Sequence, residues 1–161
     1  MNKRNAYIGI GFIALVGAWY AFRPELLFID KKVSEALPTQ QAAIAKGTEP
    51  AILVKGEFRG LAHETKGAAT VHQLPDGTRV LRLSQFETSN GPDVHVYLVA
   101  AEVAKDNATV KEAGFIDLGS LKGNKGDQNY DLPSGADLNK YKSVSIWCAR
   151  FGVNFGAATL S

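Results

Sequence analysis

A single cysteine, Cys148, carries the most distinctive chemistry in this sequence. It has no partner for an intramolecular disulfide, so a redox or ligand-binding role would belong to the thiol itself. Arg150 lies two residues further on, on the same face if the segment is a strand, where its charge would stabilise a thiolate. The alternative is a buried small hydrophobic residue, because free cysteine is among the most buried residue types and Val144 and Ile146 are apolar neighbours. Both interpretations stay open.

The three histidines are His63, His72 and His95. His63 is expected in a loop and His95 at the start of a strand, directly after a turn that contains Asp93, and such positions can converge at one end of a β-sandwich. His63, Asp93 and His95 are therefore candidates to bind a cofactor beside Cys148, and hydrogen-bonded structural roles are the alternative. We expect His72 on the solvent-facing side of a strand.

Several specific sites are excluded by spacing. A blue-copper site needs a histidine and usually a methionine shortly after the cysteine, but no histidine follows Cys148 and the sole methionine is Met1. Covalent haem attachment needs a second cysteine. The glycine-rich run 119–126 lacks the Gly-Lys-Ser/Thr ending of a phosphate loop, and we interpret it as a turn. Non-covalent haem, copper and iron remain the cofactor candidates, and no motif selects among them.

The N-terminal residues 5–22 contain no formal charge. As a helix these 18 residues would measure roughly 27 Å, close to the thickness of a bilayer core. Lys3 and Arg4 precede the run, so the positive-inside rule predicts a single-pass anchor with a cytoplasmic N-terminus and a periplasmic or cell-surface domain. The alternative is a cleaved signal peptide with small residues at 16–18. Both hypotheses export the rest of the chain.

Residues 23–49 are predicted to be a connector, and the folded domain to occupy residues 50–161. Ile29 and Val33 have the spacing of a short helix lying at the membrane surface, and the alternative is a simple stalk.

Beyond Pro50 the pattern changes to short β-like runs separated by turns, which predicts an all-β fold: a single antiparallel β-sandwich or barrel-like domain after one N-terminal transmembrane helix. Asp76-Gly77 is a strong hairpin signal. Residues 102–113 are long for a hairpin loop and compatible with one helical turn. The expected strands are Ile52–Phe58, Ala68–Leu74, Arg79–Phe86, Val94–Ala100, Phe115–Leu121, Tyr130–Leu132, Ser143–Phe151 and Val153–Leu160.

Side-chain alternation divides two of these strands into faces that are both partly apolar. A central strand covered on both sides would explain this, and a recessed aromatic site built from Tyr97, Trp147 and Phe151 is the less favoured alternative. The predicted faces are Val94, Val96 and Leu98 against His95, Tyr97 and Val99, and Val144, Ile146, Cys148 and Arg150 against Ser145, Trp147, Ala149 and Phe151.

The 18 basic and 16 acidic residues are interspersed along the chain and leave a net charge of +2. This balance argues against a nucleic-acid partner, which would require a basic cluster.

A set of short segments, taken in order, resembles the DM-thirteen domain, a module also found in Skeletor-type proteins beside DOMON domains. The resemblance covers about residues 50–161. It implies a β-sandwich-like fold with an electron-transfer or redox role, in which the cysteine at position 148 is the active group. The segments are Gly56-Glu57-Phe58, His63, Gly67, Leu81-Arg82-Leu83, Phe86, Asn90 to Leu98, Leu118 to Gly126, Ser145 to Cys148 and Phe151 to Gly156.

Two functions therefore stay open, and neither is that of a classical enzyme. In the first, Cys148, aided by His63, Asp93 or His95 and by Arg150, exchanges electrons with a redox protein partner at the membrane surface. In the second, the domain is a ligand-binding or adhesion module in which the cysteine is only packed inside. Reactivity of the thiol in the folded protein separates the two.

Overall fold

The computed structural model describes residues 9, 11–13, 15–17, 19–20, 29–38 and 49–161. The described residues between 9 and 20 have helical backbone. Within the described ranges there is no helix with the length and apolar character needed to cross a membrane. Much of the predicted anchor at 5–22 lies outside those ranges, so the anchor stays a prediction.

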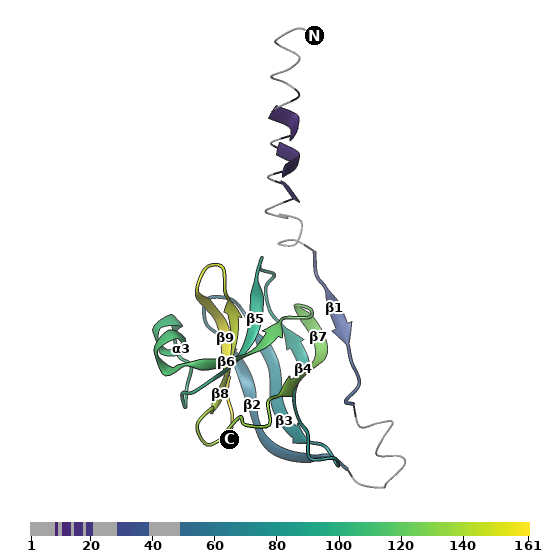
Figure 1. Ribbon diagram of the computed structural model, residues 1–161, viewed down its shortest axis with the longest axis vertical. Coiled ribbons are helices and arrows are strands. Elements are labelled where there is room, and N and C mark those ends of the chain that lie inside the picture. The colour runs from purple at the N-terminus through teal and green to yellow at the C-terminus, as the bar shows by residue number, and fades with distance from the viewer. Residues whose placement is uncertain (1–8, 10, 14, 18, 21–28, 39–48) are drawn as a thin grey trace.

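The described residues form a nine-stranded sheet with the strand order β1-β7-β4-β3-β2-β9-β8-β5-β6. Neighbouring strands are antiparallel except for β1 and β7, which are parallel. Figure 1 shows that the sheet curls into an open half-barrel with α3 on its outer side. The elements are β1 Lys32–Ser34, β2 Ala51–Gly60, β3 Lys66–Gln73, β4 Arg79–Glu87, β5 Val94–Val99, α3 Asn107–Ala113, β6 Phe115–Ser120, β7 Lys125–Leu132, β8 Ser143–Cys148 and β9 Val153–Thr159.

The predominantly β fold is as predicted, and the turn between β3 and β4 shows why. Gly77 has a φ of +87° and its N–H donates to Leu74 O at 2.9 Å, while the Asp76 carboxylate accepts from the Thr78 N–H at 2.9 Å. A residue that tolerates positive φ and an aspartate that bonds the backbone two residues on are the elements of a tight turn.

The segment between β5 and β6 holds a true helix, α3, where the sequence predicted no more than one turn. Asp106 caps it, since its carboxylate accepts from the Thr109 N–H at 2.7 Å, and Gly114 follows its last residue. Val110 points from α3 onto the sheet and is fully buried. The cap and the terminal glycine are ordinary helix signals that a short segment offers only weakly.

Strands β5 and β8 are covered on both faces, as the favoured alternation predicted. Their inner faces join the larger hydrophobic cluster, and their outer faces form a smaller cluster beneath α3. The proposed aromatic site is not formed as predicted, because Phe151 is 68% exposed in a turn while Tyr97 and Trp147 are buried. The inner side chains are Val94, Val96, Leu98, Val144, Ile146 and Cys148. The outer side chains of the two strands include Tyr97, Val99 and Trp147, which cluster with Val110 of α3.

Part of the predicted connector belongs to the sheet. Residues 32–34 form β1, which pairs with β7 so that Val33 lies opposite Gly126. The helix expected through Val33 was therefore wrong. Strand β7 is also longer than predicted and begins at Lys125, within a run that had been assigned to a turn.

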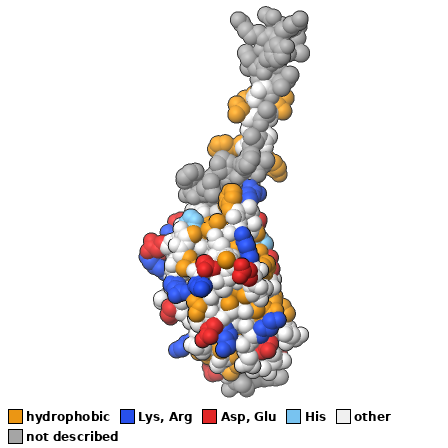
Figure 2. Space-filling model, turned by 90° about the vertical axis from the view of Figure 1, so that its left-hand side faces the viewer, with side chains coloured by type: hydrophobic (Ala, Val, Ile, Leu, Met, Phe, Trp, Pro, Cys, Tyr) orange, Lys and Arg blue, Asp and Glu red, His pale blue; other side chains and the backbone are white. Residues whose placement is uncertain are grey.

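Charged side chains of both signs are mixed on the face shown in Figure 2. Some charged side chains of the domain form ion pairs: Arg82 lies 2.7 Å from Asp127, and Lys66 lies 2.7 Å from Glu64. Such surface pairs neutralise each other locally.

Candidate functional site

Four connections meet at one end of the half-barrel, which we call the upper end. The strands β2, β4, β6 and β8 all run toward this end, and one connection follows each of them. These connections are residues 61–65, 88–93, 121–124 and 149–152. In Figure 1 this end faces the N-terminal part of the chain, and the turn between β3 and β4 lies at the opposite, lower end. The candidate site residues all lie at or beside the upper end: His63, Asp93, His95, Cys148 and Arg150.

Cys148 is the last residue of β8 and is completely buried in the larger hydrophobic cluster. It lies in register with Val94 of β5 and Val153 of β9. Its backbone carbonyl accepts from the Gly152 N–H at 2.8 Å and so closes the turn 149–152. The thiol therefore sits directly beneath an exposed turn but is sealed from solvent by apolar neighbours.

Arg150 does not share the face of Cys148. The alternation that placed it there required β8 to continue to residue 151, but the strand ends at Cys148 and Arg150 lies exposed in the following turn. Gly152, with a φ of +64°, completes that turn. Sequence alternation fails here because it carries no information about where a strand stops.

His95 lies on the outer face of β5 between two carboxylates. Its Nδ1 is 2.9 Å from Asp117 Oδ2 and its Nε2 is 3.2 Å from Asp93 Oδ1. Carboxylates only accept hydrogen bonds, so both contacts are hydrogen bonds when both ring nitrogens carry protons. Asp117 also accepts from the Gly119 N–H at 2.8 Å, which fixes its position. The sequence had paired His95 with Asp93 as candidates but missed Asp117, which reaches this place through the β5–β6 pairing.

His63 contacts a different group. Its ring lies against Phe155 with a centroid distance of 3.9 Å, and its backbone N–H donates to Phe155 O at 3.1 Å. Each of the two candidate histidines thus has its own partners. His72 is half-buried and not solvent-facing as predicted, and burial, with the nearby charge of Arg82, lowers its pKa.

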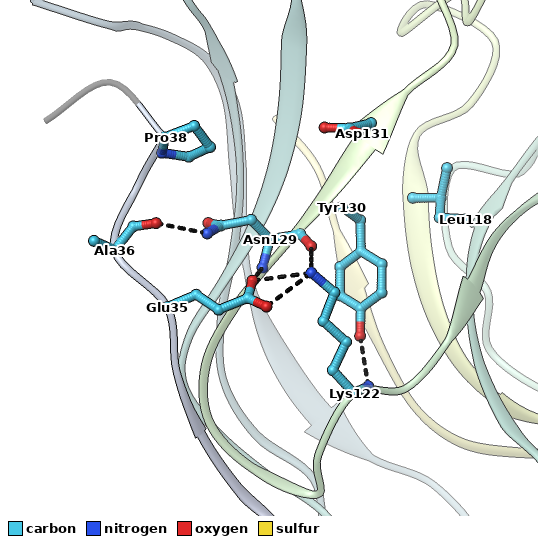
Figure 3. Close-up of a pocket in the computed structure, with 8 residues that line it drawn as sticks. All are labelled: Glu35, Ala36, Pro38, Leu118, Lys122, Asn129, Tyr130 and Asp131. Atoms are coloured by element: carbon cyan, nitrogen blue, oxygen red, sulfur yellow. Dashed lines mark hydrogen bonds and ion pairs between the residues drawn. The ribbon is translucent and has the colours of Figure 1, made fainter. Parts of the chain in front are cut away.

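Two clefts border the connector. One of about 430 Å³ lies at the upper end between Ile29, the loop 89–94 and the segment 120–124. The other, of about 580 Å³, lies between the residues after β1 and strand β7 (Figure 3). Both are therefore completed by residues that the sequence had assigned to a connector.

A polar cluster lines the second cleft, as Figure 3 shows. The Glu35 carboxylate accepts from Lys122 Nζ at 2.9 Å and from the Asn129 N–H at 2.7 Å. Burial alone would raise the pKa of the Glu35 carboxyl, but these hydrogen bonds outweigh it and hold the pKa below its usual value. Burial raises the pKa of Tyr130, whose hydroxyl accepts from the Lys122 N–H at 3.1 Å. None of these residues was singled out from the sequence.

The glycines of the segment 118–126 make room for the connector. A Cβ at Gly126 would collide with the backbone oxygen of Val33, and one at Gly123 with that of Lys31. Asn124 completes the attachment, because its side chain accepts from the Lys31 N–H at 2.7 Å and donates to Asp30 at 2.8 Å. The run 119–126, which was interpreted as a turn, is thus the surface against which the connector packs.

The candidate side chains that the structure describes are not gathered into a metal site. Within the described part of the chain, no group of three or more His, Cys, Asp or Glu side chains is placed to hold a metal ion. His95 is already engaged by carboxylates, His63 by an aromatic ring, and Cys148 is enclosed by apolar side chains. Their arrangement therefore does not fit a shared copper or iron ion.

The fold and the upper end define a small β-rich domain in which a buried cysteine and a carboxylate-bound histidine lie on opposite faces of two neighbouring strands. The family described as Electron transfer DM13 matches residues 57–160. The chain belongs to this family, whose description assigns electron transfer to the domain. No curated protein and no solved structure matches the chain.

Proposed function

We propose that the protein is an electron-transfer module held on the outer side of a membrane by its N-terminal segment, with Cys148 as the group that changes redox state. The observation that carries the proposal is that parts of four family segments meet at the upper end, near the strand end that bears the only cysteine: His63, Asn90 to Asp93, Leu121 to Asn124 and Phe151-Gly152. Membership of an electron-transfer family supports the class of function. The uncharged run 5–22 behind Lys3 and Arg4 supports the location.

Burial sets the conditions under which Cys148 can react. Complete burial among apolar side chains keeps reagents and partners away from the sulfur, so the closed state protects it. Cys148 directly precedes the turn 149–152, which is held by two backbone hydrogen bonds, from the Gly152 N–H to Cys148 O and from the Ala149 N–H to Asp93 O, both at 2.8 Å. Opening of this turn would let the sulfur meet a partner and let the thiol proton leave with the electron. Reactivity is then controlled by a local opening equilibrium.

A redox protein partner would find the polar contacts it needs on the outer face of β5. Asp93 and Asp117 flank His95 there, and their side chains are 42% and 40% exposed. Partly exposed carboxylates beside a redox site favour a partner with a basic surface, since charge complementarity speeds association and orients the encounter.

The test is the reactivity of the lone thiol in the full-length protein in detergent. Because the chain has one cysteine, alkylation measured by mass spectrometry reports on Cys148 alone. We expect modification within minutes under native conditions and a change of mass at the sulfur after a mild peroxide, both absent from the Cys148→Ala variant. A thiol that is modified only at denaturant concentrations that unfold the whole domain, and that no oxidant alters, would contradict the redox role.

The location has its own test. A reporter enzyme fused after Ser161 should be active only in the exported compartment, because the positive residues at the N-terminus retain that end in the cytoplasm. Activity in the cytoplasm would reverse the orientation without bearing on the thiol.

A ligand-binding or adhesion module is the second candidate, and the complete burial of Cys148 among apolar side chains favours it. In this case the cysteine is a core residue, and the upper cleft beside Asn90 and Asn124 would accept the ligand. Failure of the native thiol to react, together with full stability of the domain, is the outcome expected of this function.

A further inference from the structure

Three large apolar side chains are exposed at the upper end. Phe151 is 68% exposed in the turn after β8, Ile29 is 61% exposed where the connector joins the domain, and Leu61 is 38% exposed after β2. Single exposed apolar residues are common on any surface. Here they come from three separate segments that the topology brings to one end, which asks for a common explanation.

At this end the acidic and the basic residues differ in whether they have partners. Its acidic residues are engaged: Asp93 with His95, Glu64 with Lys66, and Asp30 with Lys125. The exposed basic residues Arg150 and Lys31 form no ion pair with another described residue. The upper end therefore offers cations beside apolar side chains, while these three carboxylates each lie against a lysine or histidine nitrogen.

Covalent geometry fixes which way this end faces if the N-terminal run is inserted in a bilayer. Only six residues separate Phe22, the last residue of the uncharged run, from Ile29. At about 3.5 Å per residue this chain reaches about 25 Å at most. The connector is then tied to the upper end, since the Asp30 carboxylate lies 2.7 Å from Lys125 Nζ and 2.8 Å from Asn124 Nδ2. The lower end lies further away by the length of the strands, roughly 30 Å for the ten residues of β2.

We propose that the upper end rests on the lipid headgroup layer, with Phe151 inserted between headgroups and Arg150 and Lys31 against lipid phosphates. Aromatic side chains favour the membrane interface, and basic side chains favour an anionic surface. This inference rests on the membrane anchoring proposed above. It adds an orientation: the turn 149–152, which directly follows Cys148, is the part of the domain that touches the membrane.

The test uses the full chain in lipid vesicles and a fluorescent label at one introduced cysteine. Cys148→Ala provides the background. Leu61→Cys places the label at the upper end, and Ser134→Cys places a matched label in the exposed loop after β7, at the lower end. Far-ultraviolet circular dichroism confirms that each variant is folded, and flotation after an alkaline wash confirms that the chain is inserted.

We expect lipids that carry a quencher to reduce the fluorescence at position 61 at least threefold more than at position 134. Adding Phe151→Asp and Arg150→Glu to the Leu61→Cys chain should remove at least half of that difference. Vesicles with anionic lipid should quench position 61 more than neutral vesicles do. Equal quenching at the two positions in a chain that floats would overturn the proposed contact and leave the anchor standing. A folded chain that does not float would overturn both.

Discussion

The core around Cys148 and the edge where β1 meets β7 are held by opposite kinds of contact. At the core, Cys148 and Ile146 are completely buried among apolar side chains contributed by neighbouring strands. At the edge, Glu35 is held by hydrogen bonds from Lys122 and Asn129, about ninety residues away in the sequence. Apolar burial contains no titrating group and so has no pH dependence of its own, while the edge depends on charge. The domain therefore closes over its cysteine by packing and attaches its connector by polar contacts.

Truncation in the core gives the largest expected effect. Ile146→Ala should lower the free energy of unfolding by about 3 kcal/mol, because it removes three buried carbons and leaves a cavity. The matched change at the edge, Val33→Ala, should cost less than about 1 kcal/mol, because Val33 is only half-buried. Urea denaturation measures both. Equal losses would show that the edge is packed as a second core.

Replacing Cys148 by serine tests whether water or a polar group reaches this position in the core. Cys148→Ser should be less stable than Cys148→Ala by about 1 kcal/mol or more, because a buried hydroxyl without a partner loses its hydrogen bonds to water. Thermal or urea unfolding of the two variants gives the difference. A serine variant as stable as the alanine variant would mean that water or a polar group reaches this site, which would bring the thiol closer to the chemistry proposed for it.

Gly126→Ala tests the edge by steric exclusion. Gly126 has a φ of +98° and would place a Cβ against the backbone oxygen of Val33, whereas Gly77 has a φ of +87° with open space around it. Both alanine variants should lose about 1 kcal/mol through backbone strain. Only Gly126→Ala should also release β1, seen as faster hydrogen exchange of the Glu35 amide, which bonds to Asp127 O at 2.9 Å. Unchanged exchange would show that β1 tolerates displacement.

The smallest expected effect is that of pH on the edge. Since the pKa of Glu35 in the folded protein is below its usual value, the carboxylate stabilises the fold above about pH 4.5, and this contribution fades as pH falls through the folded pKa. Glu35→Gln should therefore cost less than about 1 kcal/mol at pH 7, because the carboxylate is partly solvated, and this cost should shrink as the pH falls through the folded pKa. A stability gap that is independent of pH would assign the contact to packing.

The same contrast explains how far the sequence could predict the structure. Alternation correctly divided β5 and β8 into two buried faces, and Asp76-Gly77 correctly marked a hairpin, because these features depend on neighbouring residues. Strand β1 was missed because three residues between polar neighbours carry no periodic pattern, and their pairing with β7 is set by residues far along the chain.

The candidate site was predictable to a similar degree. The sequence placed Asp93 beside His95, and the structure joins them, because a turn followed by a strand keeps residues two apart close together. Asp117 was missed because only strand pairing brings it to His95. Arg150 was placed on the wrong face because the strand ends three residues earlier than the sequence predicted. The burial of Cys148 agrees with one of the two interpretations open from the sequence, and whether the sulfur reacts stays a prediction.

The parallel pairing of β1 with β7 also determines how the domain bears force. A pull on Ile29 away from the upper end acts along the axis of β1, so the bonds from Lys125 to Lys31 and from Glu35 to Asp127, together with the Lys122–Glu35 ion pair, are loaded in shear and share the tension. In a strand peeled from its end, the bonds would break one after another. Through β1, the connector therefore transmits a pulling force on the N-terminal segment to the sheet.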